Sequence, residues 1–325
     1  MPFSLHIEAG AGTSAAPFLK IDAGARASAM GGAFVALADD SNAIFHNPAG
    51  MALLDRKEVG LAHNEWFEGI KSENLSYGHP LGPASTLGFG ANLFLSGSMD
   101  KYNENGIKTG SFDFFEGAFS IGLALDMGKG FYAGAAAKNI YQKTDSEKAF
   151  AYAGDLGFIY NQGSLNLGAA LQNLGSEMKL YKESFDLPFG FLAGAAYRVK
   201  NYGWLTLEIS GYNDARTAFS AGAEGELPVN VREMIFLRAG FVSGRSRDAG
   251  SGLSAGIGIR NQGLRIDYAF VPFGELGNSH KISMSFKFGP DREGEESKPK
   301  RKKSTKQKPQ KERTKDKKDE IYFIW

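Results

Sequence analysis

The feature that most constrains this chain is a two-residue period of apolar side chains that continues for most of its length. Between residues 57 and 289 the sequence divides into segments of roughly 9–17 residues, and within each one every second residue is apolar. A period of two places neighbouring side chains on opposite faces of a β-strand, so each segment has an apolar face and a small or polar face. In 281–288 the two faces are Ile282, Met284, Phe286 and Phe288 against Lys281, Ser283, Ser285 and Lys287.

Fourteen segments of this kind can be counted, and an even number is expected of a bacterial transmembrane β-barrel. We predict strands near 57–68, 71–80, 84–98, 111–126, 131–143, 149–160, 164–174, 187–199, 204–212, 217–227, 233–243, 251–260, 264–272 and 279–289.

The connections between these segments alternate in length. Short links containing Gly, and in most cases Asn, fall at 81–83, 128–130, 161–163, 201–203 and 261–263, and such residues suit tight hairpin turns. Longer links at 99–110, 175–186 and 243–250 lie between them. Outer-membrane barrels have short periplasmic turns and long outer loops, so we expect the short turns, and with them both termini, on the periplasmic side.

A soluble β-sandwich also has alternating strands and is the main alternative. The segments are long for soluble strands, whose usual length is roughly 5–6 residues, and their number is high for one sandwich. Glycine makes up 42 of 325 residues and is concentrated on the polar face, as in a crowded lumen. No uncharged apolar run of about 18 residues occurs, which excludes a transmembrane helix but not barrel strands. We therefore predict an all-β, transmembrane antiparallel barrel of about fourteen strands in the outer membrane.

Residues 20–56 do not alternate, and they contain three short motifs in a fixed order. The motifs are Gly24-Ala25-Arg26-Ala27 with Met30-Gly31-Gly32-Ala33-Phe34, then Ala38-Asp39-Asp40, then Asn47-Pro48-Ala49-Gly50. This segment resembles the opening of the PorV/PorQ family, whose barrels are related to the FadL type of fatty-acid channel. The resemblance extends over most of residues 13–289 and implies a FadL-like barrel with an N-terminal plug.

The resemblance implies two roles that the residues do not separate. PorV-related proteins act in type IX secretion, where they hold or shuttle exported cargo, whereas FadL-type barrels pass hydrophobic molecules through the lumen. Our first hypothesis is a component of protein export that binds secretion proteins or cargo through the outer loops at 99–110 and 175–186. The alternative is a FadL-like transporter of hydrophobic small molecules. A third hypothesis makes the barrel an anchor for its C-terminal tail.

The plug motifs also have a local physical meaning. Ser41 or Asn42 can cap a short helix, Asn47 can cap a second one, and Pro48 suits a first helical position because its missing N–H needs no partner there. A plain turn before the first strand is the alternative for 47–50. Asp39 and Asp40 are expected to interact with a helix dipole rather than to bind a cation.

Residues for catalysis or cofactor binding are not grouped in this sequence. The chain has no cysteine, its five histidines have no metal-binding spacing, and neither a phosphate-binding loop nor a nucleophile elbow occurs. We expect no enzymatic activity, no metal and no cofactor. Charged residues on the polar face are expected to pair across the lumen or with plug carboxylates, because a Lys or Arg facing lipid near the midplane costs roughly 2–4 kcal/mol.

The last part of the chain has a different composition. Residues 291–325 hold thirteen Lys and Arg and eight Asp and Glu, and the central part of this tail has no large apolar residue. It cannot bury a core and is expected to be disordered. In the periplasm it would meet anionic lipid, cell-wall polymer or an acidic partner rather than nucleic acid, and its apolar end at 321–325 either docks on a partner or imitates a barrel assembly signal.

These observations divide the chain into four parts. They are a flexible leader at 1–19, a plug at 20–56, a barrel at 57–289 and a basic tail at 290–325. The first residues show no charged region followed by an apolar run, so we expect the export signal to lie outside this sequence.

Overall fold

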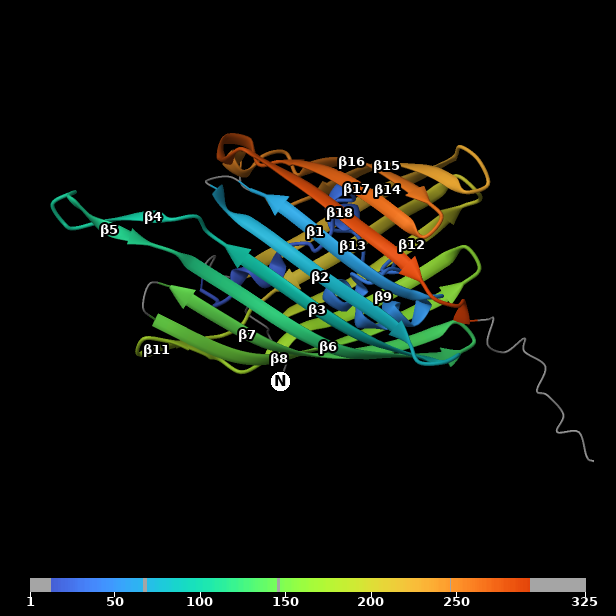
Figure 1. Cartoon of the computed structure of the whole chain (residues 1–325), viewed down its shortest axis with the longest axis horizontal. Coiled ribbons are helices and arrows are strands. Elements are labelled where there is room, and N and C mark those ends of the chain that lie inside the picture. The colour runs from blue at the N-terminus through green and yellow to red at the C-terminus, as the bar shows by residue number, and fades with distance from the viewer. Residues whose placement is uncertain (1–12, 67–68, 145–146, 246, 293–325) are drawn as a thin grey trace, which may run out of the picture.

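Fourteen antiparallel strands form a closed barrel in a computed structural model that describes residues 13–66, 69–144, 147–245 and 247–292. Each strand pairs with the strands before and after it among these fourteen, and β1 closes the barrel against β18 (Figure 1). The strand count, the antiparallel order and the closure confirm the predicted fold class.

The barrel strands agree with the predicted segments to within a few residues. They are β1 (Lys57–Glu65), β2 (Lys71–Pro80), β3 (Ser85–Leu95), β6 (Phe114–Gly128), β7 (Phe131–Thr144), β8 (Glu147–Gln162), β9 (Leu165–Gly175), β12 (Gly190–Val199), β13 (Gly203–Tyr212), β14 (Ala215–Pro228), β15 (Glu233–Val242), β16 (Leu253–Asn261), β17 (Leu264–Pro272) and β18 (Asn278–Phe288).

Two of the long connections contain hairpins that the sequence pattern does not predict. The first consists of β4 (Met99–Tyr102) and β5 (Lys108–Phe112), and the second of β10 (Met178–Leu180) and β11 (Glu183–Phe185). Figure 1 shows the β4–β5 hairpin projecting away from the barrel. Its strands have no buried face, so their side chains carry no apolar alternation to reveal them.

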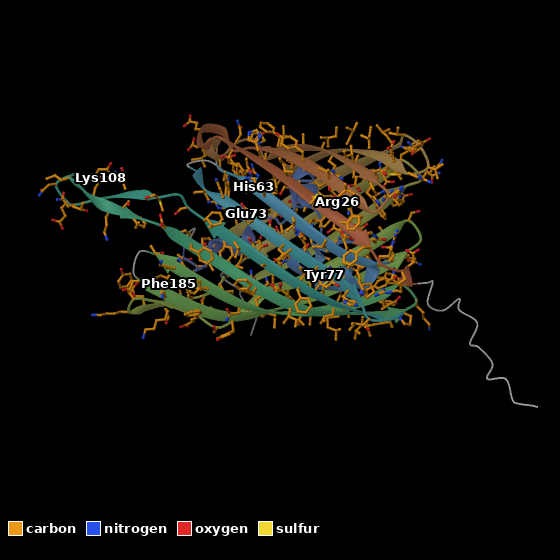
Figure 2. The ribbon with its side chains drawn as sticks, viewed as in Figure 1. Arg26, His63, Glu73, Tyr77, Lys108 and Phe185 are labelled. Carbon is orange, nitrogen blue, oxygen red and sulfur yellow. The ribbon has the colours of Figure 1, made fainter. Side chains whose placement is uncertain are left out.

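The outer surface of the barrel is apolar. Along β6, for example, Phe119, Ile121, Leu123 and Leu125 all face outward and are exposed. Aromatic side chains stack near the turn end, including Tyr77 on Phe288, as in the girdles of membrane barrels. A polar exception lies near the loop end, where His63 and Glu73 face outward and form a hydrogen bond of 2.7 Å (Figure 2).

The inner face of the strands lies directly against the plug, and glycines of the strands stand at points of contact. A Cβ added at Gly134 would lie 2.4 Å from the backbone of Ala49, and one at Gly168 would lie 2.4 Å from the carbonyl oxygen of Val35. A Cβ at Gly240 would lie 2.1 Å from the backbone nitrogen of Gly31. The glycines of the polar face therefore make room for a second layer of chain inside the lumen.

That second layer is the N-terminal segment. It contains η1 (Pro17–Lys20), α1 (Ala25–Ala29), α2 (Ala43–His46) and η2 (Pro48–Leu53), and two further short helices, η4 (Arg247–Ala249) and η5 (Gly274–Leu276), lie in loops. Within the lumen α1 packs against β15 to β18, whereas η2 packs against β6 to β8 on another part of the wall. Among the described residues, no helix is long and apolar enough to cross a membrane.

The described ends of the chain lie at opposite mouths of the barrel. The backbone N–H of Ala15 donates to the carbonyl oxygen of Asp186 in a long loop, so the described part of the chain begins at the loop end, whereas the backbone N–H of Arg292 donates to the carbonyl oxygen of Asp55 at the turn end. The expectation that both termini share the turn end is therefore not met by these described ends; residues 1–12 and 293–325, which include most of the basic tail, lie outside them. The packed segment also begins earlier than residue 20, because Phe18 is only 2% exposed in an apolar cluster with Ile140 and Met178.

Candidate functional site

The plug is held in the barrel by Asn47 and the turn that follows it. The Asn47 side chain accepts a hydrogen bond of 3.1 Å from the backbone N–H of Ala49, so it caps η2 as the sequence predicts, and Pro48 stands at the first helical position. The side-chain amide nitrogen of Asn47 also donates to the carbonyl oxygens of Val35 at 2.8 Å and Phe158 at 3.1 Å. One fully buried side chain thus joins two parts of the plug to strand β8.

The predicted caps at residues 41 and 42 act differently. Asn42 is the N-cap of α2 but makes no capping hydrogen bond with its side chain. Its side-chain oxygen instead accepts from the Ser76 hydroxyl at 3.1 Å, and Ser41 lies 2.8 Å from the same hydroxyl. These two side chains therefore attach the plug to strand β2.

Two glycines of the plug motifs lie where their backbone passes very close to other backbone segments of this protein. Gly31 has a φ of +65°, and a Cβ there would lie 2.7 Å from the backbone of Phe241. A Cβ at Gly50 would lie 1.8 Å from the carbonyl oxygen of Ala38. Gly24 precedes α1 as its N-cap, Gly32 follows Gly31, and Met30, the C-cap of α1, is fully buried.

Arg26 of the plug is the centre of a buried charge cluster. Its guanidinium donates to both carboxylate oxygens of Glu224 on β14 at 2.9 Å and also binds Asp39 and Asp40. Glu224 in turn accepts from Arg238 of β15 at 2.7 Å. The remaining members are Arg265, 3.2 Å from Glu224, and Asp267, 2.8 Å from Arg238.

This environment keeps Arg26 charged. Burial alone would lower the pKa of its guanidinium, but the negative charges of Asp39 and Glu224 outweigh burial and raise the pKa well above the ordinary value. A permanently charged group at this position links the plug to the barrel wall by electrostatic attraction and by bidentate hydrogen bonds.

One expectation about charged residues is corrected by the structure, and a second is confirmed. Asp39 and Asp40 bind the Arg26 guanidinium, although Asp40 also accepts from the backbone N–H of Asn42 near the start of α2. Charged residues of the polar face are also expected to pair across the lumen or with plug carboxylates, and both are seen: Arg265 lies 3.2 Å from Glu224 across the lumen, and Lys287 lies 2.7 Å from Asp55 of the plug segment. In the Arg26 cluster the charges are reversed, because the plug supplies the arginine and the barrel supplies the carboxylate of Glu224. No group of three or more candidate metal ligands occurs among the described residues.

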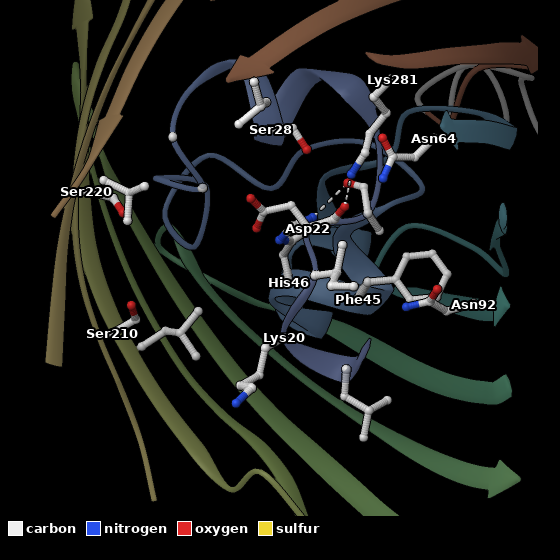
Figure 3. A pocket seen from close by; sticks show the side chains of 18 of the residues that line it. Lys20, Asp22, Ser28, Phe45, His46, Asn64, Asn92, Ser210, Ser220 and Lys281 are labelled. Atoms are coloured by element: carbon white, nitrogen blue, oxygen red, sulfur yellow. Dashed lines mark hydrogen bonds between the residues drawn. The ribbon is translucent and has the colours of Figure 1, made fainter. Parts of the chain in front are cut away.

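A cavity of about 310 Å³ lies on the loop side of the plug. The plug contributes Asp22, Phe45 and His46 to its lining, and the strands contribute Glu208 and Lys281 among others. Figure 3 shows Lys281 reaching the plug backbone at Asp22, with Asn64 beside it. The lining alternates between apolar patches and serine, asparagine and charged side chains.

A second cavity, of about 400 Å³, lies at the turn end and shares no lining residue with the first. It is lined by charged residues that include Asp39, Asp40, Glu58 and Arg265. The plug and the Arg26 cluster therefore separate a loop-side cavity from a turn-side cavity.

Sequence patterns located the plug residues but not their partners. Alternation along β13 places Glu208 on the polar face, yet its role depends on the plug, where it accepts from the backbone N–H groups of Phe34 at 2.9 Å and Val35 at 2.8 Å. Glu224 was not singled out. Its inward position on an alternating strand was the only signal available, and many inward residues share it.

Comparison with known proteins agrees with this architecture. The sequence model of a family described as "Uncharacterised protein family (UPF0164)" matches residues 8–184, more than half of the chain. The chain belongs to the UPF0164 family. Two UPF0164 proteins of Treponema pallidum (strain Nichols) are 29% identical over 183 residues and 37% identical over 70 residues. The first match covers 49% of this chain and 42% of the relative, and the second covers 22% and 21%, so the matched parts span less than half of either relative.

Solved structures extend the comparison from the UPF0164 family to the fold. The CymD monoaromatic hydrocarbon channel has a TM-score of 0.62 at 10% identity and covers 82% of this chain and 97% of its own. The toluene transporter TbuX of Ralstonia pickettii has 0.58 at 14% identity, with 82% and 98% covered. A FadL homologue of Pseudomonas aeruginosa has a TM-score of 0.56 at 12% identity and covers 82% of this chain and 98% of its own. This UPF0164 protein is a closed, fourteen-stranded β-barrel with a FadL-like fold.

Proposed function

We propose that this protein is a FadL-like channel that takes small molecules with a hydrophobic part into the loop-side cavity. The observation that carries this proposal is a closed barrel with a cavity of about 310 Å³ between the plug and the loop end. Ligand pockets in proteins usually begin near this size and combine apolar walls with a few polar groups. Here Leu19, Ile21, Phe45, Leu192 and Val271 supply apolar surface.

The related structures support the same proposal. Solved structures with a similar fold include a monoaromatic hydrocarbon channel and a toluene transporter. Because identity to these proteins is only 10–14%, the proposal for this chain depends on its own cavity.

Uptake by cells tests the proposal. The chain is expressed in the outer membrane of a Gram-negative host that lacks its own FadL-type channels, and entry of radiolabelled toluene is measured. We expect faster uptake than in the empty host, and we expect Ser210→Phe to reduce it because Ser210 lines the cavity. Ser111→Phe is the matched control, since Ser111 lies exposed in the β4–β5 hairpin. Uptake equal to that of the empty host would refute the proposal.

The role in protein export stays a prediction from the PorV/PorQ resemblance. The observation in its favour is the β4–β5 hairpin, in which Met99, Tyr102 and Ile107 are exposed. A lone two-stranded hairpin is only marginally stable in water and its edges are unpaired, so a protein partner would stabilise it.

A deletion tests the export role separately from the fold. The backbone N–H of Ser96 donates to the carbonyl oxygen of Phe114 at 3.0 Å, and the Ser96 hydroxyl accepts from the backbone N–H of Phe114 at 2.9 Å. Removal of 98–112 therefore leaves Gly97 and Asp113 as a two-residue turn with Gly first. We expect the barrel to assemble normally. Loss of co-purified secretion components or cargo on deletion would support export, and a full-length barrel that purifies alone under gentle extraction would count against it.

A further inference from the structure

The loop-side cavity holds charged groups that a plain hydrocarbon would leave without a partner, so a hydrocarbon is expected to pass through it but not to be its best ligand. Two of its lysines are neutralised by carboxylates, because Lys20 lies 2.6 Å from Asp214 and Lys138 lies 2.7 Å from Asp155. The other charged groups of the lining have no opposite charge within 4.0 Å among the described residues. An apolar ligand would bury those charges without compensation, which is costly.

Two of the uncompensated groups are cations. Lys281 on β18 is 3% exposed, and its ammonium donates only to the backbone carbonyl oxygen of Asp22. Arg245 follows β15, donates to the carbonyl oxygen of Pro272 at 3.0 Å and lies 4.3 Å above the ring of Phe273. Neither contacts a carboxylate within the part of the chain that the structure describes, so both are available to an anionic group.

Two further uncompensated groups are carboxylates. The side chain of Asp22 has no hydrogen bond or ion pair to any described residue, although its backbone oxygen accepts from Lys281. Glu208 is 7% exposed, and one of its oxygens accepts two backbone N–H groups of the plug, but no cation lies within 4.0 Å of it among the described side chains. Both residues line the cavity.

Opposite charges meet beside the plug, where Lys281 donates to the backbone of Asp22, and Glu208 lines the same cavity from another part of the wall. Glu208 belongs to β13 and Lys281 to β18, which lie five strands apart in the barrel order, and Arg245 extends from the loop after β15. In Figure 3 Ser210 and Ser220 lie on one side of the cavity, and Lys281 and Asn64 lie on the other. The two unpaired positive and two unpaired negative groups balance, so the cavity best complements a ligand that carries both charges itself.

We propose that the loop-side cavity binds a small zwitterion with an apolar body, such as a hydrophobic amino acid. Its ammonium group is held by Asp22 and Glu208, its carboxylate by Lys281 and Arg245, and its apolar body lies against Phe45. This inference rests on the proposed channel function and names the class of solute for the same cavity.

A series of four compounds on one aromatic frame tests the inference. Phenylalanine carries both charges, 3-phenylpropanoate only the carboxylate, phenethylamine only the ammonium, and ethylbenzene neither. Binding of each to the full chain in nanodiscs is measured by equilibrium dialysis. We expect phenylalanine to bind at least about 10-fold more tightly than the other three, since a hydrogen bond to a charged group typically contributes this much or more.

Variants assign each end of the ligand. Lys281→Met is expected to weaken phenylalanine and phenylpropanoate about 10-fold and to leave phenethylamine unchanged, whereas Asp22→Asn should do the reverse. Arg245→Met repeats the first test outside the strand wall, in case Lys281→Met does not fold. Lys287→Met is the matched control, because Lys287 lies on the same strand at the turn end and pairs with Asp55.

The outcomes separate the inference from the proposed function. Equal or tighter binding of ethylbenzene, or an order of affinities that no charge variant alters, would overturn the zwitterion assignment while toluene uptake by cells could still support a channel. Absence of binding by all four compounds, together with absence of toluene uptake, would overturn both.

Discussion

Replacement of Arg26 by methionine should release the plug while the barrel stays closed. The substitution removes one positive charge from a cluster of three arginines and four carboxylates, whose members are Arg26, Arg238, Arg265, Glu224, Asp267, Asp39 and Asp40. Removing one partner of a buried ion pair costs roughly 3–5 kcal/mol, because the other charge is left buried. Glu224 keeps Arg238 at 2.7 Å and Arg265 at 3.2 Å, so the lower end, about 3 kcal/mol, is expected.

Hydrogen exchange measured by mass spectrometry reports this change locally. Opening of the plug need not unfold the strands, so a global melting experiment would miss part of the effect. A loss of about 3 kcal/mol corresponds to roughly 100-fold faster exchange in peptides covering α1, with little change in β1 to β3. The exchange rate of Arg26→Lys should fall between those of the unmodified protein and Arg26→Met, because an ammonium group cannot bind Glu224 through two parallel hydrogen bonds.

Two comparisons make the test decisive. Lys108→Met removes the ion pair of Lys108 with Asp100 at 2.6 Å, which lies in the β4–β5 hairpin, and it should leave plug exchange unchanged. The double variant Arg26→Met with Glu224→Gln should cost less than the sum of the two single changes, because the residues contact each other. Plug exchange less than about 3-fold faster in Arg26→Met, or additive single effects, would refute the assigned role of the cluster.

Three further predictions follow from the same structure. Gly157→Ala places a Cβ 2.0 Å from a plug side chain and should destabilise the plug by about 1–3 kcal/mol in the same exchange assay, whereas Gly110→Ala, with no atom within 4 Å, should not. Burial favours a higher pKa for Asp55, but the hydrogen bond and charge of Lys287 outweigh burial and lower that pKa. The stability that this pair contributes is therefore present above about pH 4 and is lost as the pH falls through the folded-state pKa. Lys287→Met should flatten the acid limb of a curve of melting temperature against pH, and an unchanged limb would contradict this. Deletion of 293–325 should leave heat-modifiable folding intact because β18 pairs with β1 along its length, and failed assembly would instead assign the signal role to the aromatic end.

The sequence by itself determined the class of fold and the number of barrel strands. A two-residue period is a local property, and in a barrel every strand needs it, because one face meets lipid and the other meets the lumen. Local chemistry likewise located the cap at Asn47 and the first helical position at Pro48, since the partner of each lies within a few residues. The exposed hairpin β4–β5 could not be predicted, because a hairpin without a buried face has no alternation of apolar side chains.

Only the tertiary structure decided what the charged residues do. Arg26 and Glu224 are 198 residues apart, and Glu208 meets Phe34 across 174 residues, so no periodicity could pair them. The uncompensated charges of the loop-side cavity became visible in the same way, because whether Lys281 has a counter-charge depends on which strands and plug atoms surround it. Alternation shows only that a side chain faces inward; its partner is set by how the closed barrel arranges the plug.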